Sequence, residues 1–211
     1  MTGTEISDRA PRFDCIVFPF SRDQLDITDA AAVQSAARSC RPDMIVNCAA
    51  YTAVDRAESE PTAAVAVNTE GARNLARAAE SAGVPMIHIS TDYVFGGEGQ
   101  RPYKPEEDTH PLGVYGRTKL AGETAVREET PDHIIVRTSW VFSHRGHNFV
   151  KTIVRLAGER DELRVVSDQF GRPTSAADLA EALLVAADAL AKNRDCAGTY
   201  HFANAGETSW F

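Results

Sequence analysis

The sequence has no long apolar run and few cysteines. No stretch reaches the roughly 18 apolar residues that a membrane-spanning helix needs, and no signal peptide is recognisable, so we expect no membrane partner. None of the four cysteines forms a C-x-x-C pair with another. This spacing favours reduced thiols in a cytoplasmic protein and gives no reason to expect a metal site.

Basic residues are also in deficit, with 22 Lys and Arg against 30 Asp and Glu and a formal net charge of −8. This balance argues against nucleic acid or an anionic membrane as the main partner, although a locally positive site could still bind a small anion. With 43% hydrophobic and 25% charged residues, the composition is that of a globular protein. A chain of 211 residues can bury one sizeable core.

Short apolar runs alternate with helical patterns along the chain. The predicted strands are Phe13–Phe18, Asp43–Ala50, Val84–Ser90, His133–Phe142, Leu163–Val166 and Thr199–Asn204. The predicted helices are Ala30–Ser39, Pro61–Ala82 ending at Gly83, Gly116–Glu129, Asn148–Glu159 and Leu179–Lys192. Apolar strands separated by helices predict an α/β, Rossmann-like, doubly wound parallel sheet. The polar stretch Gly96–Pro111 is expected to be a loop over a strand end.

Tyr115 and Lys119 lie in "GVYGRTKLAGE", between Gly113 and Glu123. Residues four apart share one face of a helix, with their Cβ atoms about 5–6 Å apart. An ammonium there is expected to lower the pKa of the phenol, which could then act as a general acid. The alternative is a half-buried tyrosine beside a lysine that extends its ammonium to solvent.

Other candidate residues follow predicted strands. Thr91, in "STDYVF", comes directly after the apolar run "MIHI", so its hydroxyl is expected at the ligand crevice, although turn chemistry is the alternative. The small residues of "NCAAYTAVD" (Asn47–Asp55) would let a flat ring or ribose approach the backbone. Asp26 and Ile27 could contact an adenine, or could simply begin a helix.

Taken together these segments resemble the extended, sugar-nucleotide branch of the short-chain dehydrogenase/reductase superfamily, and within it the dTDP-4-dehydrorhamnose reductase family. The matching segments, in order, are "QLDITD", "NCAAYTAVDRAESEP", "VNTEGARNLA", "HISTDYVFGG", "PLGVYGRTKLAGE", "VRTSWVF", "NFVKTI", "DQFGRPT" and "NAGETSWF". The resemblance implies reduction of the 4-keto group of dTDP-4-dehydrorhamnose to dTDP-L-rhamnose with NADPH or NADH. It implies a nucleotide-sugar substrate and leaves a homodimer open.

The resemblance also implies residue roles. Tyr115 would donate the proton, Lys119 would hold the nicotinamide ribose and keep the pKa of the tyrosine low, and Thr91 would bind the reacting oxygen. The other implied cofactor contacts are Ala49, Ala50, Tyr51, Asp26 and Ile27. The other implied substrate contacts are Asp92, Tyr93, Trp140, Asn148 and Arg172. We expect a single NAD(P)-binding domain over residues 1–211, with a smaller substrate-binding portion from residues 140–175 and the C-terminal end.

The strand-end triplet Thr91-Asp92-Tyr93 separates a reductase from related dehydratases. Sugar-nucleotide dehydratases have Thr-Asp-Glu there, and their acidic pair drives the elimination of water. A plain reduction needs no such pair, so the triplet favours a reductase. Two alternatives stay open: a non-catalytic sugar-nucleotide or NAD(P)-binding relative, and a reductase of another nucleotide-linked keto sugar.

The N-terminal segment departs from the family pattern. The family begins with a strand and a G-x-x-G-x-x-G turn that binds the cofactor pyrophosphate, whereas Gly3 is the only glycine here before Gly71. The resemblance therefore predicts that the chain is truncated at both ends, lacks the first strand and glycine-rich turn, and binds NADPH poorly or not at all. No acidic residue ends the Phe13–Phe18 run, which weakens a strict preference for NAD, and Arg22 is a candidate for a 2′-phosphate.

Overall fold

The computed structural model describes residues 1–98 and 101–211. The chain divides into two compact units. The sheet unit comprises Phe18–Arg137 and Val185–His201, and the smaller unit comprises Met1–Val17, Thr138–Leu184 and Phe202–Phe211. The predicted contribution of residues 140–175 to substrate binding stays a prediction.

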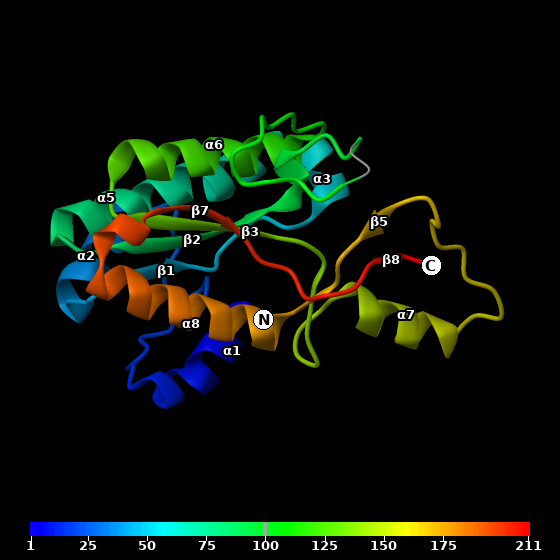
Figure 1. Cartoon of the computed structure of the whole chain (residues 1–211), viewed down its shortest axis with the longest axis horizontal. Helices are drawn as coiled ribbons and strands as arrows, with labels where there is room; N and C mark the ends of the chain where they lie inside the picture. The colour runs from blue at the N-terminus through cyan, green and yellow to red at the C-terminus, as the bar shows by residue number, and fades with distance from the viewer. Residues whose placement is uncertain (99–100) are drawn as a thin grey trace. The chain divides into compact units, whose positions relative to one another are not determined.

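The sheet unit is built on a four-stranded sheet in the order β1-β2-β3-β7. Its strands are β1 (Ile45–Asn47), β2 (Met86–Thr91), β3 (His133–Thr138) and β7 (Gly198–His201). β1 pairs with β2 in parallel, and β3 pairs with β7 in parallel. Helices connect successive strands along the chain (Figure 1). The predicted α/β class with a parallel sheet is confirmed.

Helices of the sheet unit follow the predicted pattern closely. They are α2 (Ala30–Cys40), α3 (Val54–Ser59), α4 (Pro61–Val65), the π-helix η2 (Ala66–Gly71), α5 (Ala72–Ala82) and α6 (Val114–Glu129). Asp29 begins α2 by accepting hydrogen bonds from the backbone of Ala31 and Ala32. Gly83 ends α5 in the left-handed conformation, with φ of 68°, as expected of a glycine cap. Two short 3₁₀ turns complete the set, η3 (Asp92–Val94) and η4 (Arg194–Cys196).

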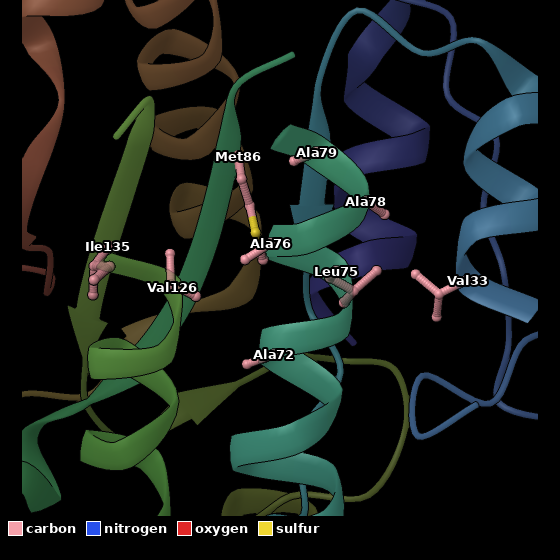
Figure 2. Close-up of a cluster of buried hydrophobic side chains, with 9 residues drawn as sticks. All are labelled: Val33, Ala72, Leu75, Ala76, Ala78, Ala79, Met86, Val126 and Ile135. Carbon is pink, nitrogen blue, oxygen red and sulfur yellow. The ribbon is translucent and has the colours of Figure 1, made fainter. Parts of the chain in front are cut away.

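The core of the sheet unit lies between the sheet and its helices. Figure 2 shows Met86 of β2 reaching toward Ala76 of α5, while Leu75 of α5 and Val33 of α2 point toward each other. Small alanines on α5 let the helix lie close to the sheet, and the larger side chains fill the remaining space. The cluster consists of Val33, Ala72, Leu75, Ala76, Ala78, Ala79, Met86, Val126 and Ile135. α5 and α6 thus cover one face of the sheet (Figure 1).

The smaller unit has little regular sheet. It contains α1 (Thr2–Arg9), the 3₁₀ turn η1 (Ala10–Phe13) and α7 (Phe149–Ala157). Strand β4 (Val141–Phe142) pairs in parallel with β6 (Thr174–Ser175), and β5 (Phe170–Gly171) pairs in antiparallel with β8 (Thr208–Ser209). Helix α8 (Ala176–Lys192) begins in this unit and continues into the sheet unit. Among the described residues, no helix is long and apolar enough to cross a membrane.

Three strand predictions differ from the structure. Phe13–Phe18 is irregular after Phe13, with Ile16 86% exposed, because an apolar run forms a strand only where a neighbouring strand accepts its hydrogen bonds. Leu163–Val166 is likewise irregular. His133–Phe142 is interrupted at Trp140, whose φ of 47° breaks the extended chain and leaves two strands in separate sheets. Of the predicted loop Gly96–Pro111, residues 99–100 lie outside the described part, and the remainder is irregular.

Candidate functional site

Helix α6 carries Tyr115 and Lys119, and two features fix the position of its first turns. Its N-cap residue, Gly113, offers no side chain, and Glu58 of α3 instead accepts a hydrogen bond from the backbone of Val114 at 2.7 Å. Gly116 lies so close to the carbonyl oxygen of Tyr93 that an added Cβ would overlap it. The glycine beside the tyrosine therefore lets α6 approach the end of β2.

Gly122, farther along α6, makes a second close approach. An added Cβ there would overlap the carbonyl oxygen of Asn68 in η2. Asn68 in turn holds the segment after β1, because its Oδ1 accepts from the backbone of Tyr51 at 2.8 Å and its Nδ2 donates to the carbonyl of Tyr51 at 3.2 Å. The sequence pattern did not single out Asn68. Its role is to join η2 to the predicted cofactor segment Ala49–Tyr51.

The predicted pair Thr91 and Tyr115 comes together at the carboxyl end of β2. Thr91 lies near enough to the phenol to act on its pKa, and the ring of Tyr93 meets the Tyr115 ring edge-on at 5.4 Å. Burial raises the pKa of Tyr115 to about 12, and the nearby Thr91 hydroxyl acts in the opposite direction. The expected lowering of the phenol pKa is therefore wrong for this structure. At neutral pH the phenol keeps its proton.

Thr91 has one hydroxyl proton and several neighbours that can accept it. Its Oγ1 donates to Asp92 at 3.0 Å and accepts from the backbone of Tyr93 at 3.2 Å. Burial raises the pKa of Asp92 to about 6, with the hydrogen bond from Thr91 acting against this rise. The hydroxyl proton of Thr91 is thus directed at Asp92 in this structure.

Lys119 is buried behind this pair, with only 1% of its surface exposed. Its Nζ donates to the carbonyl of Ile89 at 2.7 Å and lies 3.3 Å from Nε2 of His88. Burial lowers the pKa of Lys119 to about 8, while the carboxylate of Glu123 acts in the opposite direction. The alternative of a lysine extending to solvent is therefore wrong. The ammonium is held by β2.

Glu123 anchors α6 to the sheet one turn beyond Lys119. It is fully buried and accepts from Ser90 at 2.6 Å and from Arg137 Nε and Nη2 at 2.9 and 2.8 Å. Burial alone would raise the pKa of Glu123, but the bonds from Arg137 and Ser90 outweigh it and hold the pKa below the usual value. A glutamate four residues after Lys119, on the same helix face, was the sequence signal for this residue.

Two predicted adenine contacts lie in the turn before α2. Asp26 accepts from the backbone and hydroxyl of Thr28 at 2.9 and 2.8 Å, and these bonds lower its pKa. Ile27 packs against Gly71, where an added Cβ would lie 2.5 Å from the Ile27 side chain. Both residues have structural roles in this turn. Their predicted contact with the cofactor stays a prediction.

The remaining predicted substrate residues belong to the smaller unit. Trp140 stacks on Trp210 with ring centroids 3.9 Å apart. Asn148 begins α7 by accepting from the backbone of Lys151 at 3.2 Å, and it donates to the carbonyl of Ser143 at 2.6 Å. Arg172 has an exposed side chain, and its carbonyl accepts from Ser139 at 2.7 Å. A substrate role for these three residues stays a prediction.

Comparison with known proteins gives consistent matches over the chain. The model of the RmlD substrate binding domain matches residues 1–211. A dTDP-4-dehydrorhamnose reductase from Sinorhizobium fredii is 49% identical over 201 residues, which are 94% of this chain and 68% of that protein. The corresponding protein of Escherichia coli K12 is 48% identical over 88% of this chain and 62% of its own length.

Solved structures give the same result. The dTDP-4-dehydrorhamnose reductase from Bacillus anthracis in complex with NADP superimposes with a TM-score of 0.91 at 41% identity, over 100% of this chain and 73% of that one. The reductase from Clostridium acetobutylicum gives 0.92 at 41% identity, over 99% and 72%. The chain thus spans 62–73% of the length of these relatives. A UDP-glucose 4-epimerase from Brucella ovis, at 20% identity, shares the fold alone.

Proposed function

Since the chain belongs to the RmlD substrate binding domain family, we propose that it reduces the 4-keto group of dTDP-4-dehydrorhamnose to give dTDP-L-rhamnose, with NADPH or NADH. The observation that carries the proposal is the placement of Thr91 close to Tyr115 at the end of β2, with Lys119 buried and donating to the Ile89 carbonyl of the same strand. These three groups supply an acid and an orienting hydroxyl beside a cation. A keto reduction needs these groups when the hydride comes from elsewhere.

The residues near β1 and β2 fit a nicotinamide cofactor. Lys119 as an ammonium has three donors, and its recorded hydrogen-bond partners are the Ile89 carbonyl and His88. One donor therefore remains for a ribose hydroxyl. The small side chains of Ala49 and Ala50 leave room for a flat ring at the end of β1. The bound cofactor would supply the hydride.

Tyr115 would give its proton to the oxygen that becomes the new hydroxyl. A sugar alkoxide is a much stronger base than a phenolate, so a phenol whose pKa is about 12 is still acidic enough to protonate it. The same high pKa keeps the phenol protonated and ready at neutral pH. Thr91 would orient the reacting oxygen, and the Lys119 ammonium would stabilise the phenolate left behind.

We propose two sets of substrate contacts. Asp92 and Tyr93 follow β2 directly and would contact the keto sugar, while Trp140, Asn148 and Arg172 would contact the rest of the nucleotide sugar. Arg172 is exposed, and its guanidinium suits a pyrophosphate. All four cysteines are free, which fits a reducing cytoplasm as the compartment. A homodimer is the assembly we propose to test by light scattering.

The test compares Tyr115→Phe with the unaltered chain. Both are supplied with dTDP-4-dehydrorhamnose and saturating NADPH, because weak cofactor binding would otherwise mask turnover. We expect dTDP-L-rhamnose to form in step with NADPH oxidation, and Tyr115→Phe to lower kcat about 10²- to 10⁴-fold, since general acid catalysis contributes that much. Near-normal turnover by Tyr115→Phe would remove the phenol from the mechanism.

A further inference from the structure

A buried chain of polar side chains runs from β1 through β2 to Lys119. Asn47 and His88 are register partners on the paired strands, and Asn47 Nδ2 lies 3.0 Å from His88 Nδ1. On the other side of the ring, His88 Nε2 lies 3.3 Å from Lys119 Nζ. All three residues are buried. Their hydrogen bonds must therefore be satisfied mainly by one another.

The backbone fixes the direction of this chain. The N–H of Ala49 donates to Asn47 Oδ1 at 2.9 Å, so the oxygen of the Asn47 amide faces Ala49 and its NH₂ group faces His88. His88 Nδ1 must then accept. A neutral imidazole carries its single proton on one nitrogen, so the proton of His88 lies on Nε2 and points at Lys119.

This arrangement disfavours charge on Lys119. An ammonium has donors only, so it cannot accept the Nε2–H of His88, whereas a neutral amine can. If Lys119 is charged, the His88 proton must move to Nδ1, and Asn47 must turn its oxygen toward the ring. The Asn47 NH₂ group would then face the Ala49 N–H, which is also a donor. The charge of Lys119, the tautomer of His88 and the orientation of Asn47 are therefore coupled.

Other titratable groups near Lys119 and His88 also influence the pKa values of these two residues. Glu123 on α6 favours the charged form of Lys119, against the larger effect of burial. Cys48 after β1 is a neutral thiol in this range, because burial raises its pKa to about 12. Burial lowers the pKa of His88 well below its usual value, with further lowering from Lys119, from Arg127 on α6 and from His133 on β3. His88 thus stays neutral throughout the range in which Lys119 titrates. A neutral ring can still exchange the nitrogen that carries its proton.

We propose that His88, oriented by Asn47, is a positioning residue that sets the protonation state of Lys119 and so limits the pH range in which Tyr115 transfers its proton. The claim about proton transfer from Tyr115 rests on the proposed reductase function. His88 touches neither substrate nor cofactor in this scheme. It acts through Lys119.

Two isosteric variants test the coupling. Asn47→Asp keeps an acceptor for Ala49 but accepts from His88 Nδ1–H, which frees Nε2 to accept from an ammonium. His88→Gln can present an amide oxygen to Lys119 and adds no charge. We expect each variant to raise the Lys119 pKa by about one unit, a tenfold change in its dissociation constant, because each one provides an acceptor for the charged form.

The measurement is the side-chain chemical shift of Lys119 by NMR across pH, assigned with Lys119→Met. His201→Gln, a change to a β7 histidine whose recorded hydrogen bond is to Tyr103, is the matched control and should leave the titration unchanged. If His88→Gln leaves the Lys119 pKa at the wild-type value, the proposal is overturned, even if the added charge of Asn47→Asp shifts it. If Asn47→Asp alone fails to shift it, the orienting role of Asn47 is overturned.

A measurement on the unaltered chain needs no variant to fold. The ring nitrogen shifts of His88 should show the proton on Nε2 at high pH and its transfer to Nδ1 as Lys119 gains its charge. A tautomer that stays constant through the Lys119 titration contradicts the proposal.

The pH profile of turnover tests whether His88 limits the pH range in which Tyr115 transfers its proton. We expect turnover to fall at high pH with the apparent pKa of Lys119. In Asn47→Asp and His88→Gln this fall should move to higher pH by as much as the Lys119 pKa moves. If the fall of turnover at high pH stays in place while the Lys119 pKa shifts, control of catalysis by His88 is refuted. Failure of the reductase proposal itself would give a different result, namely no formation of dTDP-L-rhamnose by the unaltered chain.

Discussion

Glu123→Gln tests whether the buried ion pair with Arg137 holds α6 to the sheet. Both oxygens of Glu123 accept from Arg137, and the side chains are 0% and 5% exposed. The substitution removes one charge and leaves the Arg137 guanidinium buried without its counter-ion. It also replaces one acceptor oxygen by an NH₂ group that faces donors.

The magnitude follows from this burial. Removing one partner of a buried ion pair costs about 3–5 kcal/mol, and the amide oxygen that the Glu123→Gln variant keeps places this case near the lower end, at about 3 kcal/mol. A domain of this size loses about 2–4 °C of Tm per kcal/mol, so we expect Tm to fall by roughly 6–12 °C. The assay is thermal unfolding of the 211-residue chain at neutral pH, followed by circular dichroism.

Glu128→Gln is the matched control on the same helix. Glu128 pairs with Arg73 at 3.0 Å, but its side chain is 55% exposed, and exposed pairs contribute only about 0–1 kcal/mol. Equal Tm shifts for Glu123→Gln and Glu128→Gln would refute the argument from burial. A double variant, Glu123→Gln with Arg137→Gln, should cost less than the sum of the single changes, because the Arg137 guanidinium is then no longer buried without its counter-ion.

Two further predictions concern the end of β2. Gly116→Ala places a Cβ against the carbonyl of Tyr93 and should cost about 1–3 kcal/mol as α6 shifts, with a fall in kcat, whereas Thr124→Ala on the exposed side of α6 should change neither. Asp92→Asn removes a carboxyl whose pKa rises from 3.8 to about 6 in the fold, so the native state loses stability as pH rises through that window. Near pH 7.5 the unfolding free energy of Asp92→Asn should exceed that of the wild type by up to about 3 kcal/mol, and near pH 4 the two should match. An equal difference at both pH values would contradict the attribution to the raised pKa of Asp92.

Apolar runs predicted the central strands well because a strand buried on both faces needs apolar residues throughout. The same reasoning was wrong for Phe13–Phe18, since apolarity supplies no strand to pair with, and Ile16 lies 86% exposed. It also missed the break at Trp140. Trp140 is left-handed and stacks on Trp210, and this contact between residues far apart in the sequence leaves no local pattern.

The roles of the candidate site residues stay predictions, but the structure shows which of these residues lie close together. The strand-end rule and the four-residue spacing were enough to predict Thr91 beside Tyr115, with Lys119 one turn away. Spacing on a helix does not say where a flexible side chain points, and Lys119 points to Ile89 and His88 of β2. His88 had one sequence signal, a polar residue within the apolar run "MIHI".

Burial of the Tyr115 phenol itself explains why its pKa rises here. A nearby cation would lower the pKa of a phenol by stabilising the phenolate. Lys119 Nζ, however, donates to the Ile89 carbonyl at 2.7 Å, and burial is the largest influence on the pKa of Tyr115. A ribose hydroxyl accepting from the remaining Lys119 donor would add a hydrogen bond to the charged form and favour the ammonium. Cofactor binding would then oppose the preference that His88 and Asn47 impose. Lys119 would therefore be most fully charged when hydride and proton are both ready to move.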